Sequence, residues 1–247
     1  MNLSALQWIA LCLIFIGLFS YWGRKDPRRA LRSIPAFQQL RRTIDLSVED
    51  GSRLQISLGR GGILGPESAA AFAGLTLLRQ VTEIAADSDQ PPLVTTGDGA
   101  IMLLAQDTLR HSYNKLGISD QYTLRLAQTT GLTPFSYIAG TLPMILDRHV
   151  SASALGGSFG AEAGLLTTAA QSTAGFTLGG SENLGGQAII FASADQPLIG
   201  EELFATGAYM EAGATHQASL RAQDVLRWVI ILLLIISSVL PLFTSLP

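Results

Sequence analysis

Two glycine-rich segments of the sequence have residue types and spacing that could do chemistry. Gly156-Gly157-Ser158-Phe159-Gly160 has the Gly-x-Ser-x-Gly pattern of a nucleophile elbow, which presents a serine hydroxyl between a strand and a helix. A serine hydrolase also needs an acid, for which Asp195 is available, and a histidine. His216 is the only histidine after Ser158, and it lies shortly before an apolar segment that would tether it. We therefore interpret the motif as a chance match and expect no hydrolase activity.

The second segment is Gly59-Arg60-Gly61-Gly62-Ile63-Leu64-Gly65, which loosely resembles a dinucleotide phosphate loop. It lies between a predicted strand and a predicted helix, which is the required context. The Gly-x-Gly-x-x-Gly pattern, however, needs a glycine where Leu64 stands, and Asp98 comes too late to end the next strand in the ribose-binding position. No Walker lysine lies nearby. We favour a glycine turn over a phosphate site here.

The remaining ionisable residues form no recognisable catalytic or metal-binding set. His111 and His149 have no other ligand at metal-binding spacing. Glu162 and Glu201-Glu202 fall where carboxylates complement the positive end of a helix. Cys12 is the single cysteine, which excludes an intrachain disulfide. The sequence thus predicts no catalytic residue, no metal site and no cofactor site, and a protein that is not an enzyme.

Strands and helices alternate along the part of the chain that holds these motifs. Apolar periodicity and turn residues predict strands at Arg53–Leu58, Leu93–Thr96, Val150–Leu155, Phe176–Leu178 and Ala188–Ala192. The same signals predict helices at about 66–86, 98–116, 133–147, 161–174 and 199–210. Such alternation favours an α/β fold, a mostly parallel sheet with flanking helices.

An uncharged apolar segment stands at each end of the sequence, at Leu3–Trp22 and Trp228–Leu246. Each has about 20 residues, the length with which a helix crosses about 30 Å of hydrocarbon. We expect two transmembrane helices with the α/β domain inserted between them. A cleaved signal peptide is the alternative for the first segment, but Met1–Gln7 lacks the basic residues that a signal peptide needs.

Basic residues gather directly after the first apolar segment. Arg24, Lys25, Arg28 and Arg29 lie there, and positive charge beside a span is retained on the cytoplasmic side. We therefore expect a bacterial inner-membrane protein with a cytoplasmic insert, both termini outside, and anionic lipid headgroups near Arg24, Arg28 and Arg29. Outside the basic stretch Arg24–Arg42, the chain holds nine basic and eighteen acidic residues, which argues against nucleic acid as a partner.

These observations divide the chain into five parts. They are transmembrane helix 1 (1–23), a basic juxtamembrane linker (24–50), a cytoplasmic α/β domain (51–215), a juxtamembrane segment (216–227) and transmembrane helix 2 (228–247). A short juxtamembrane helix at Arg28–Ile44, within the linker, is the alternative to an extended linker there.

The segment Ser151–Gly180 is rich in small residues, since 22 of its 30 residues are Gly, Ala, Ser or Thr. Small side chains let backbones approach closely. Two interpretations stay open: tight packing between a strand and a helix of one subunit, or an interface between subunits, where Ala163 and Ala170 are candidate contact positions. Glu162 is the one charged residue of this segment.

Several segments resemble an uncharacterised family of two-span membrane proteins from Chloroflexi-like bacteria that is filed as a domain of unknown function. The resemblance rests on four stretches: Arg32–Ala36, Pro92–Thr96, Leu198–Ala205 and Ser219–Asp224. It fits least well at Leu155–Gly180. It implies the two-span architecture and brings no reaction, cofactor or catalytic residue with it.

Our leading hypothesis is a non-enzymatic membrane scaffold that assembles into a homo-oligomer through its α/β domain. Repeated head-to-tail contacts, confined to the membrane plane by the two spans, favour a closed ring of more than two copies. The first alternative is a ligand- or nucleotide-binding sensor that uses the loop around Gly61. The second is a membrane-bound serine hydrolase that uses Ser158 and His216.

Overall fold

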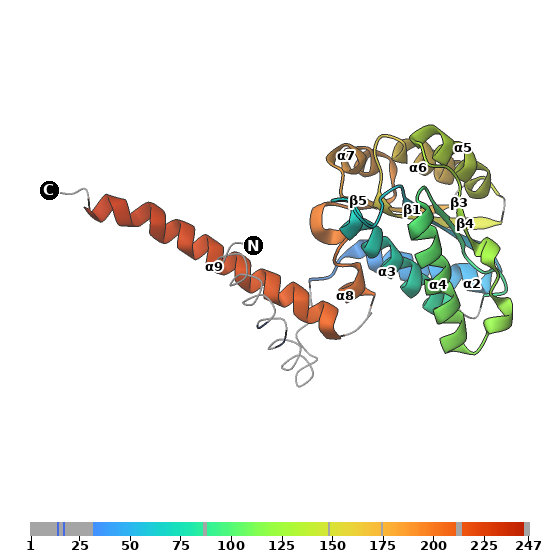
Figure 1. The fold of residues 1–247 in the computed structure, drawn as a ribbon, viewed down its shortest axis with the longest axis horizontal. Coiled ribbons are helices and arrows are strands. Elements are labelled where there is room, and N and C mark those ends of the chain that lie inside the picture. Colours follow the sequence, from blue (N-terminus) through green and yellow to red (C-terminus); the bar gives the residue numbers. More distant parts are fainter. Residues whose placement is uncertain are drawn as a thin grey trace. The chain divides into compact units, whose positions relative to one another are not determined.

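The computed structural model of this chain (Figure 1) describes residues 14, 17, 32–85, 88–147, 149–173, 175–210 and 214–244, with no side chains for 214 and 238–244. The predicted first span and the predicted lipid-facing residues Arg24, Lys25, Arg28 and Arg29 lie outside the described residues. The chain divides into two units. One is the α/β unit, Ile34–Met210, and the other contains the helix α9 (Ala214–Thr244).

The α/β unit is built on six parallel strands. They are β1 (Arg53–Gly59), β2 (Leu93–Thr96), β3 (Ala127–Thr129), β4 (Val150–Ser158), β5 (Phe176–Ser181) and β6 (Gln196–Leu198). Their order in the sheet is β3-β2-β1-β4-β5-β6, so the two longest strands, β1 and β4, lie side by side at the centre. The predicted α/β fold with flanking helices is confirmed, and every strand pairing is parallel.

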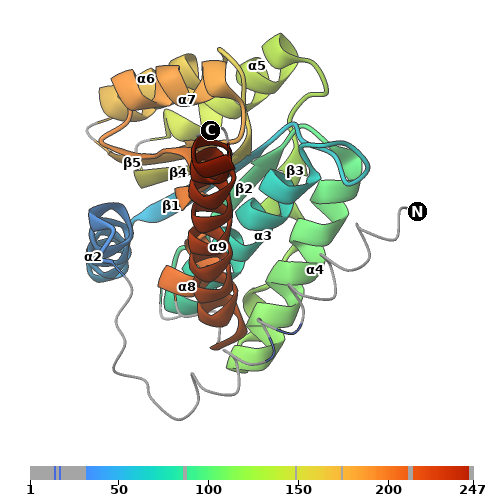
Figure 2. The same cartoon turned by 90° about the vertical axis from the view of Figure 1, so that its left-hand side faces the viewer.

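Helices cover both faces of the sheet (Figure 2). One face carries α2 (Pro35–Glu49), α3 (Ser68–Ile84), α4 (Gly99–Leu116) and the short α8 (Thr206–Tyr209). The other face carries α5 (Pro134–Ile145), α6 (Ala163–Ser172) and α7 (Leu184–Ser193). Three single turns complete the unit: η2 (Ser119–Gln121), η3 (Leu124–Leu126) and η4 (Gly200–Glu202). Covering both faces explains why the central strands are buried along nearly their whole length.

The interior differs between the two faces of the sheet. Toward α2, α3 and α4 it is aliphatic, with Leu54, Ile56 and Leu58 of β1 fully or nearly buried. The intervening β1 residues, Gln55 and Ser57, point to the other face, because side chains alternate along a strand. There they form a buried polar chain: Gln55 Nε2 donates to Ser57 Oγ at 2.9 Å and to Thr95 Oγ1 at 3.1 Å, and Thr95 Oγ1 lies 3.3 Å from the Tyr137 hydroxyl.

The predicted strand at Ala188–Ala192 is wrong, because these residues belong to α7. A short apolar run fits a buried strand or a buried helix equally well. The capping residue decides: the Asn183 side chain accepts hydrogen bonds from Gly185 N at 2.9 Å and Gly186 N at 3.2 Å and so starts a helix. The strand that follows is β6, which has only three residues.

The segment expected to be a basic linker at 24–50 contains α2. Phe37, Leu40 and Ile44 of this helix are buried in the core of the α/β unit. Their spacing of three and four residues puts them on one helix face, which explains why the helix packs on the sheet instead of spanning a gap. The compact unit accordingly runs from Ile34 to Met210, compared with the predicted 51–215.

The helix α9 runs without a break through the predicted juxtamembrane segment 216–227 and into the predicted second span. Trp228 and all seven residues of Ile230–Ile236 are large, apolar and exposed. Among the residues that the structure describes, no helix combines the length and the apolar character needed to cross a membrane.

Candidate functional site

The carboxyl ends of β1 and β4 form the place where an open parallel sheet of this order binds ligands. The chain leaves β1 for α3 on one face of the sheet and leaves the adjacent β4 for α6 on the other face. In such sheets this divergence opens a crevice outside the strand ends. The glycine loop 59–65 and the segment that carries Ser158 both lie at this edge, so the structure brings the two glycine-rich motifs together.

Backbone hydrogen bonds join the ends of neighbouring strands. Arg60 N, after β1, donates to Ser158 O of β4 at 3.0 Å, and Gly97 N, after β2, donates to Gly59 O of β1 at 2.8 Å. Gly59 has a φ of 70°, and a Cβ there would overlap the carbonyl group of Ser158. A Cβ at Gly61 would lie 2.9 Å from Ser158 Cβ. The glycines therefore serve the close approach of β1 and β4.

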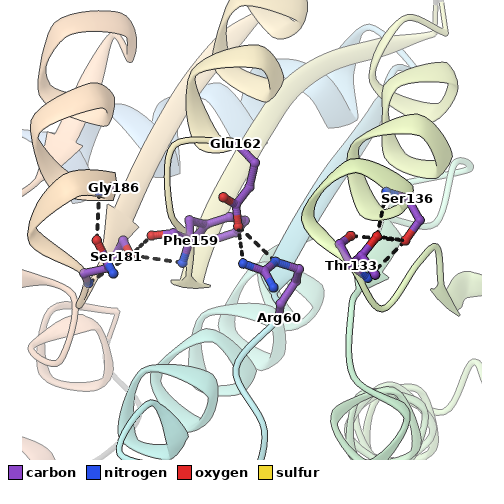
Figure 3. Close-up of polar contacts among 8 residues, drawn as sticks. Arg60, Thr133, Ser136, Phe159, Glu162, Ser181 and Gly186 are labelled. Atoms are coloured by element: carbon purple, nitrogen blue, oxygen red, sulfur yellow. Dashed lines mark hydrogen bonds and ion pairs between the residues drawn. The ribbon is translucent and has the colours of Figure 1, made fainter.

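An ion pair between Arg60 and Glu162 spans the same strand ends (Figure 3). Arg60 Nη2 lies 2.9 Å from Glu162 Oε1, and Arg60 Nε donates to the same oxygen at 3.0 Å. The Glu162 side chain is only 6% exposed and that of Arg60 is 29% exposed. Glu162 stands at the N-terminus of α6, and Arg60 is the first residue after β1. The pair thus joins the loops that diverge from β1 and β4.

The environment of Glu162 favours its charged form. Burial alone would raise the pKa of this carboxyl, but hydrogen bonds from the N–H groups of Glu162 and Gly160, together with the Arg60 guanidinium, lower the pKa below its ordinary value of 4.5. Glu162 is therefore a carboxylate beside the α6 N-terminus, where its charge is favourable, and its side chain does not cap the helix.

Other helices that start at this edge also use their own side chains as caps. Asp98 Oδ1 accepts from Ala100 N and Ile101 N of α4, both at 2.9 Å. Thr133 and Ser136 form a capping box at the start of α5 (Figure 3). With Asn183 on α7, five first-turn N–H groups that could bind an anion already have side-chain partners, namely those of Ala100, Ile101, Ser136, Gly185 and Gly186. This arrangement holds loops together and leaves no ready-made phosphate cradle at those helices.

Asp98 has one feature that the sequence did not reveal. A Cβ on Gly62 would lie 3.6 Å from Asp98 Oδ2, so this carboxylate borders the glycine loop. The spacing along the chain placed Asp98 too late for a ribose contact, because β2 ends at Thr96. The turn Gly97-Asp98 nevertheless brings the carboxylate to the edge where dinucleotide-binding sheets hold their acidic residue.

The residues required for a hydrolase do not meet in the α/β unit. Ser158 ends β4, so the motif is the end of a strand and not a separate turn. Asp195 Oδ2 accepts from Thr177 N at 2.9 Å, near the amino end of β5 and therefore at the opposite edge of the sheet. His149 directly precedes β4, also at that opposite edge, and His111 is exposed on α4. His216 belongs to the other unit.

The described ranges contain no group of three His, Cys, Asp or Glu side chains that could hold a metal ion. Glu201 and Glu202 lie in the single turn η4, where the Glu202 Oε2 atom accepts from Ile199 N at 3.2 Å. This contact agrees with the helix-end role predicted for the pair.

A second candidate site is the outer surface of α5, α6 and α7, which we call the uncharged layer. These three helices contain no Asp, Glu, Lys or Arg. Large apolar side chains are nevertheless exposed on each of them: Phe135 on α5, Leu165 on α6, and Leu184 and Phe191 on α7. Soluble surfaces are normally rich in charge, so an exposed uncharged apolar surface marks an interaction site.

The predicted contact positions in the small-residue segment are not on this surface. Ala163 and Ala170 are buried in the core beneath α6, together with Leu166. Gly156 of β4 lies so close to Gly74 of α3 that a Cβ on Gly74 would overlap the Gly156 carbonyl. The small residues therefore serve packing within one subunit, and the exposed side of α6 is formed by other residues.

A family model described as a domain of unknown function (DUF6754) matches residues 2–246 of this chain. The match covers nearly the whole chain, so the chain belongs to this family, as the resemblance predicted. Neither a curated protein nor a solved structure matches the chain.

Proposed function

We propose that this member of the family is a non-catalytic membrane scaffold that self-assembles into a homo-oligomer through its α/β unit. The observation that carries this proposal is the contrast between the two helical layers. The uncharged layer presents Phe135, Leu165, Leu184 and Phe191 to solvent. The helices α2, α3 and α4 on the other face carry nine charged residues: Arg41, Arg42, Asp45, Glu49, Arg79, Glu83, Asp107, Arg110 and Lys115.

The membrane part of the proposal rests on apolar sequence at both ends. In α9 the exposed side chains from Ile230 to Ile236 go all round the helix, which is typical of a helix in hydrocarbon or in a larger core. The basic residues after Leu3–Trp22 favour an inner-membrane protein with a cytoplasmic α/β unit, both termini outside and anionic headgroups near Arg24, Arg28 and Arg29.

The arrangement at the sheet edge supports a structural role over a catalytic one. The Arg60–Glu162 pair and the capped starts of α4, α5 and α7 use several of the groups that could hold an anionic ligand, whereas α3 and α6 have no side-chain cap. Protein groups of this kind stabilise loops, and a loop that must open for a ligand is normally held less firmly.

Particle mass tests the scaffold proposal. The full chain, extracted in mild detergent or in lipid discs, is weighed by light scattering combined with size exclusion. We expect a discrete assembly of several copies, with a closed ring as the proposed form. A single monodisperse monomer in gentle conditions would contradict the proposal.

Cysteine labelling tests the orientation separately. Asp120 is exposed in η2, so Asp120→Cys in a Cys12→Ser background offers one reactive site. We expect an impermeant maleimide to label this cysteine only after the cells are opened. Labelling of intact cells would contradict the cytoplasmic assignment without affecting the assembly result.

A second candidate function is a nucleotide- or ligand-binding sensor. It is favoured by the strand order, which is that of dinucleotide-binding sheets, and by the approach of Asp98 to Gly62. Calorimetric titration of the wild-type protein with adenine nucleotides tests it. Saturable binding that Asp98→Asn abolishes in a folded protein would support the sensor, and no saturable binding would contradict a sensor of adenine nucleotides.

A further inference from the structure

We infer that copies of this chain pair two-fold through the outer faces of α6 and α7, the uncharged layer of one copy against the same layer of the next. This inference rests on the proposed self-assembly and goes beyond it by naming the surface, the partner surface and the symmetry of the contact. It concerns only the α/β unit, Ile34–Met210.

The outer face of α7 is an apolar stripe. Leu184, Ala188 and Phe191 are exposed, and their spacing of four and three residues puts them on one side of the helix. Gly186 and Ile190 of the same helix are buried against the sheet. A helix on the edge of a soluble domain normally presents polar residues on the side away from the core, and α7 does not.

The neighbouring helix α6 extends this stripe. Leu165 and Thr168 are exposed on α6. The two helices are joined by hydrogen bonds, because Thr167 Oγ1 lies 2.7 Å from Ser193 Oγ and Gln171 Nε2 donates to Ser193 O at 2.6 Å. The surface is therefore one preformed patch of large and small side chains, which a partner can contact without first ordering it.

Charge decides which partner fits. If the uncharged layer met the α2–α4 layer of another copy, that contact would bury Arg79, Glu83 and Lys115, which now form ion pairs at the surface. Burying charges without new partners is costly. A contact between two uncharged layers buries no charge at all. A surface that pairs with its own copy makes an isologous contact, which has two-fold symmetry.

A lipid surface fits this layer less well than a second copy. Helices that lie on a bilayer carry Lys and Arg on their polar face, beside an apolar face of Trp, Phe or Leu. The sequences of α5, α6 and α7 contain Phe and Leu but no Lys or Arg. A two-fold contact alone closes at two copies, so a closed ring of more copies would need a second, different contact between such pairs.

The first test compares two exposed phenylalanines on opposite layers. Phe191 on α7 is 69% exposed and Phe72 on α3 is 50% exposed. In the full chain in lipid discs, we expect Phe191→Glu to reduce the particle mass by half or more, because a buried unpaired carboxylate opposes the contact. Phe72→Glu should leave the mass unchanged. Equal masses for wild type and Phe191→Glu would overturn the inference.

The second test determines the symmetry of the contact from disulfide cross-linking of introduced cysteines in a Cys12→Ser background. Ala188→Cys lies mid-stripe on α7, so it should meet its own copy and give a covalent dimer. Adding Leu103→Cys on α4 should give no larger species. A ladder of larger products that requires both cysteines, with no dimer from Ala188→Cys alone, would show head-to-tail contacts and overturn the inference.

The two proposals fail in different ways. A monomeric wild-type protein contradicts self-assembly itself. A wild-type oligomer that survives Phe191→Glu and gives no dimer with Ala188→Cys contradicts only the two-fold pairing through α6 and α7.

Discussion

Arg60 and Glu162 stand 102 residues apart in the sequence and form an ion pair of 2.9 Å between Nη2 and Oε1. Each residue follows a central strand of the sheet, and the strands β1 and β4 are neighbours. The pair therefore bridges the point where the chain diverges to the two helical layers. In this protein the position at which related sheet topologies bind ligands is held by two of the chain's own side chains.

Removal of the Glu162 charge should destabilise the α/β unit. We expect Glu162→Gln to lower the free energy of unfolding at pH 7 by about 2 kcal/mol, because the buried carboxylate accepts charge-assisted hydrogen bonds that an amide replaces poorly. Urea unfolding followed by circular dichroism measures this. Asp120→Asn is the control, because Asp120 is exposed on η2, and it should leave the stability unchanged.

The stabilisation that Glu162 provides should depend on pH. The pKa of Glu162 is lower in the folded protein than its ordinary 4.5, so the unfolded chain binds the proton more readily. The stabilisation is therefore complete above pH 4.5 and is lost as the pH falls through the lower, folded-state pKa. The difference between wild type and Glu162→Gln should shrink as the pH falls below 4.5. A difference that stays constant down to the acid transition would contradict this assignment.

Close approach of β1 and β4 predicts unequal effects of two glycine substitutions. Gly59 and Gly117 both have positive φ, 70° and 76°, but a Cβ at Gly117 meets nothing within 4 Å whereas one at Gly59 overlaps Ser158. Gly117→Ala should cost about 1 kcal/mol from backbone strain alone. Gly59→Ala should cost about 1–3 kcal/mol more, because strand ends must shift. Thermal unfolding of both variants checks this, and equal losses would contradict it.

The sequence predicted the parts of the fold that have local signals. Thr133-Pro134 and Asp98 start α5 and α4 as predicted, since capping chemistry depends only on neighbouring residues. β3 and β6 were not predicted, because three residues are too few to show a period. The strand order could not be predicted either, because it depends on contacts between residues far apart in the chain.

The same limit applies to the candidate site. The sequence marked Arg60 and Glu162 separately, as part of a glycine loop and as a helix-end residue, but did not pair them. A signal was present, because Arg60 lies in the loop after the predicted strand Arg53–Leu58 and Glu162 starts the helix after the predicted strand Val150–Leu155, and parallel strands end at one edge. The uncharged layer was also visible in part, since the chain from Ala127 to Ala194 holds only four charged residues: Asp147, Arg148, Glu162 and Glu182. The sequence could not show which of its apolar residues are exposed.

Two substitutions of Asp98, the cap of α4, test whether its role in stability is capping alone. Asp98→Ala should lower the free energy of unfolding by about 1 kcal/mol, because it removes the acceptor for Ala100 N and Ile101 N. Asp98→Asn should retain most of the stability, because asparagine is an equally good cap. Urea unfolding of both variants gives the measurement. An equal loss in both would show that the charge of Asp98 has a role beyond capping.

Burial of Tyr113 predicts a loss of stability in alkali. Burial raises the pKa of Tyr113 from 10.0 to about 12, so the unfolded chain releases this proton first. A raised folded-state pKa contributes stability that is complete below pH 10 and is lost as the pH rises from 10 to about 12.

The Tyr113→Phe variant lacks this proton. We therefore expect its stability to match that of the wild type at pH 8 within about 1 kcal/mol, and to exceed it by about 1–2 kcal/mol near pH 12. Urea unfolding across this range, with tyrosinate absorbance followed in parallel, measures both effects. Parallel pH profiles for the two proteins would contradict a raised pKa for Tyr113 in the folded chain.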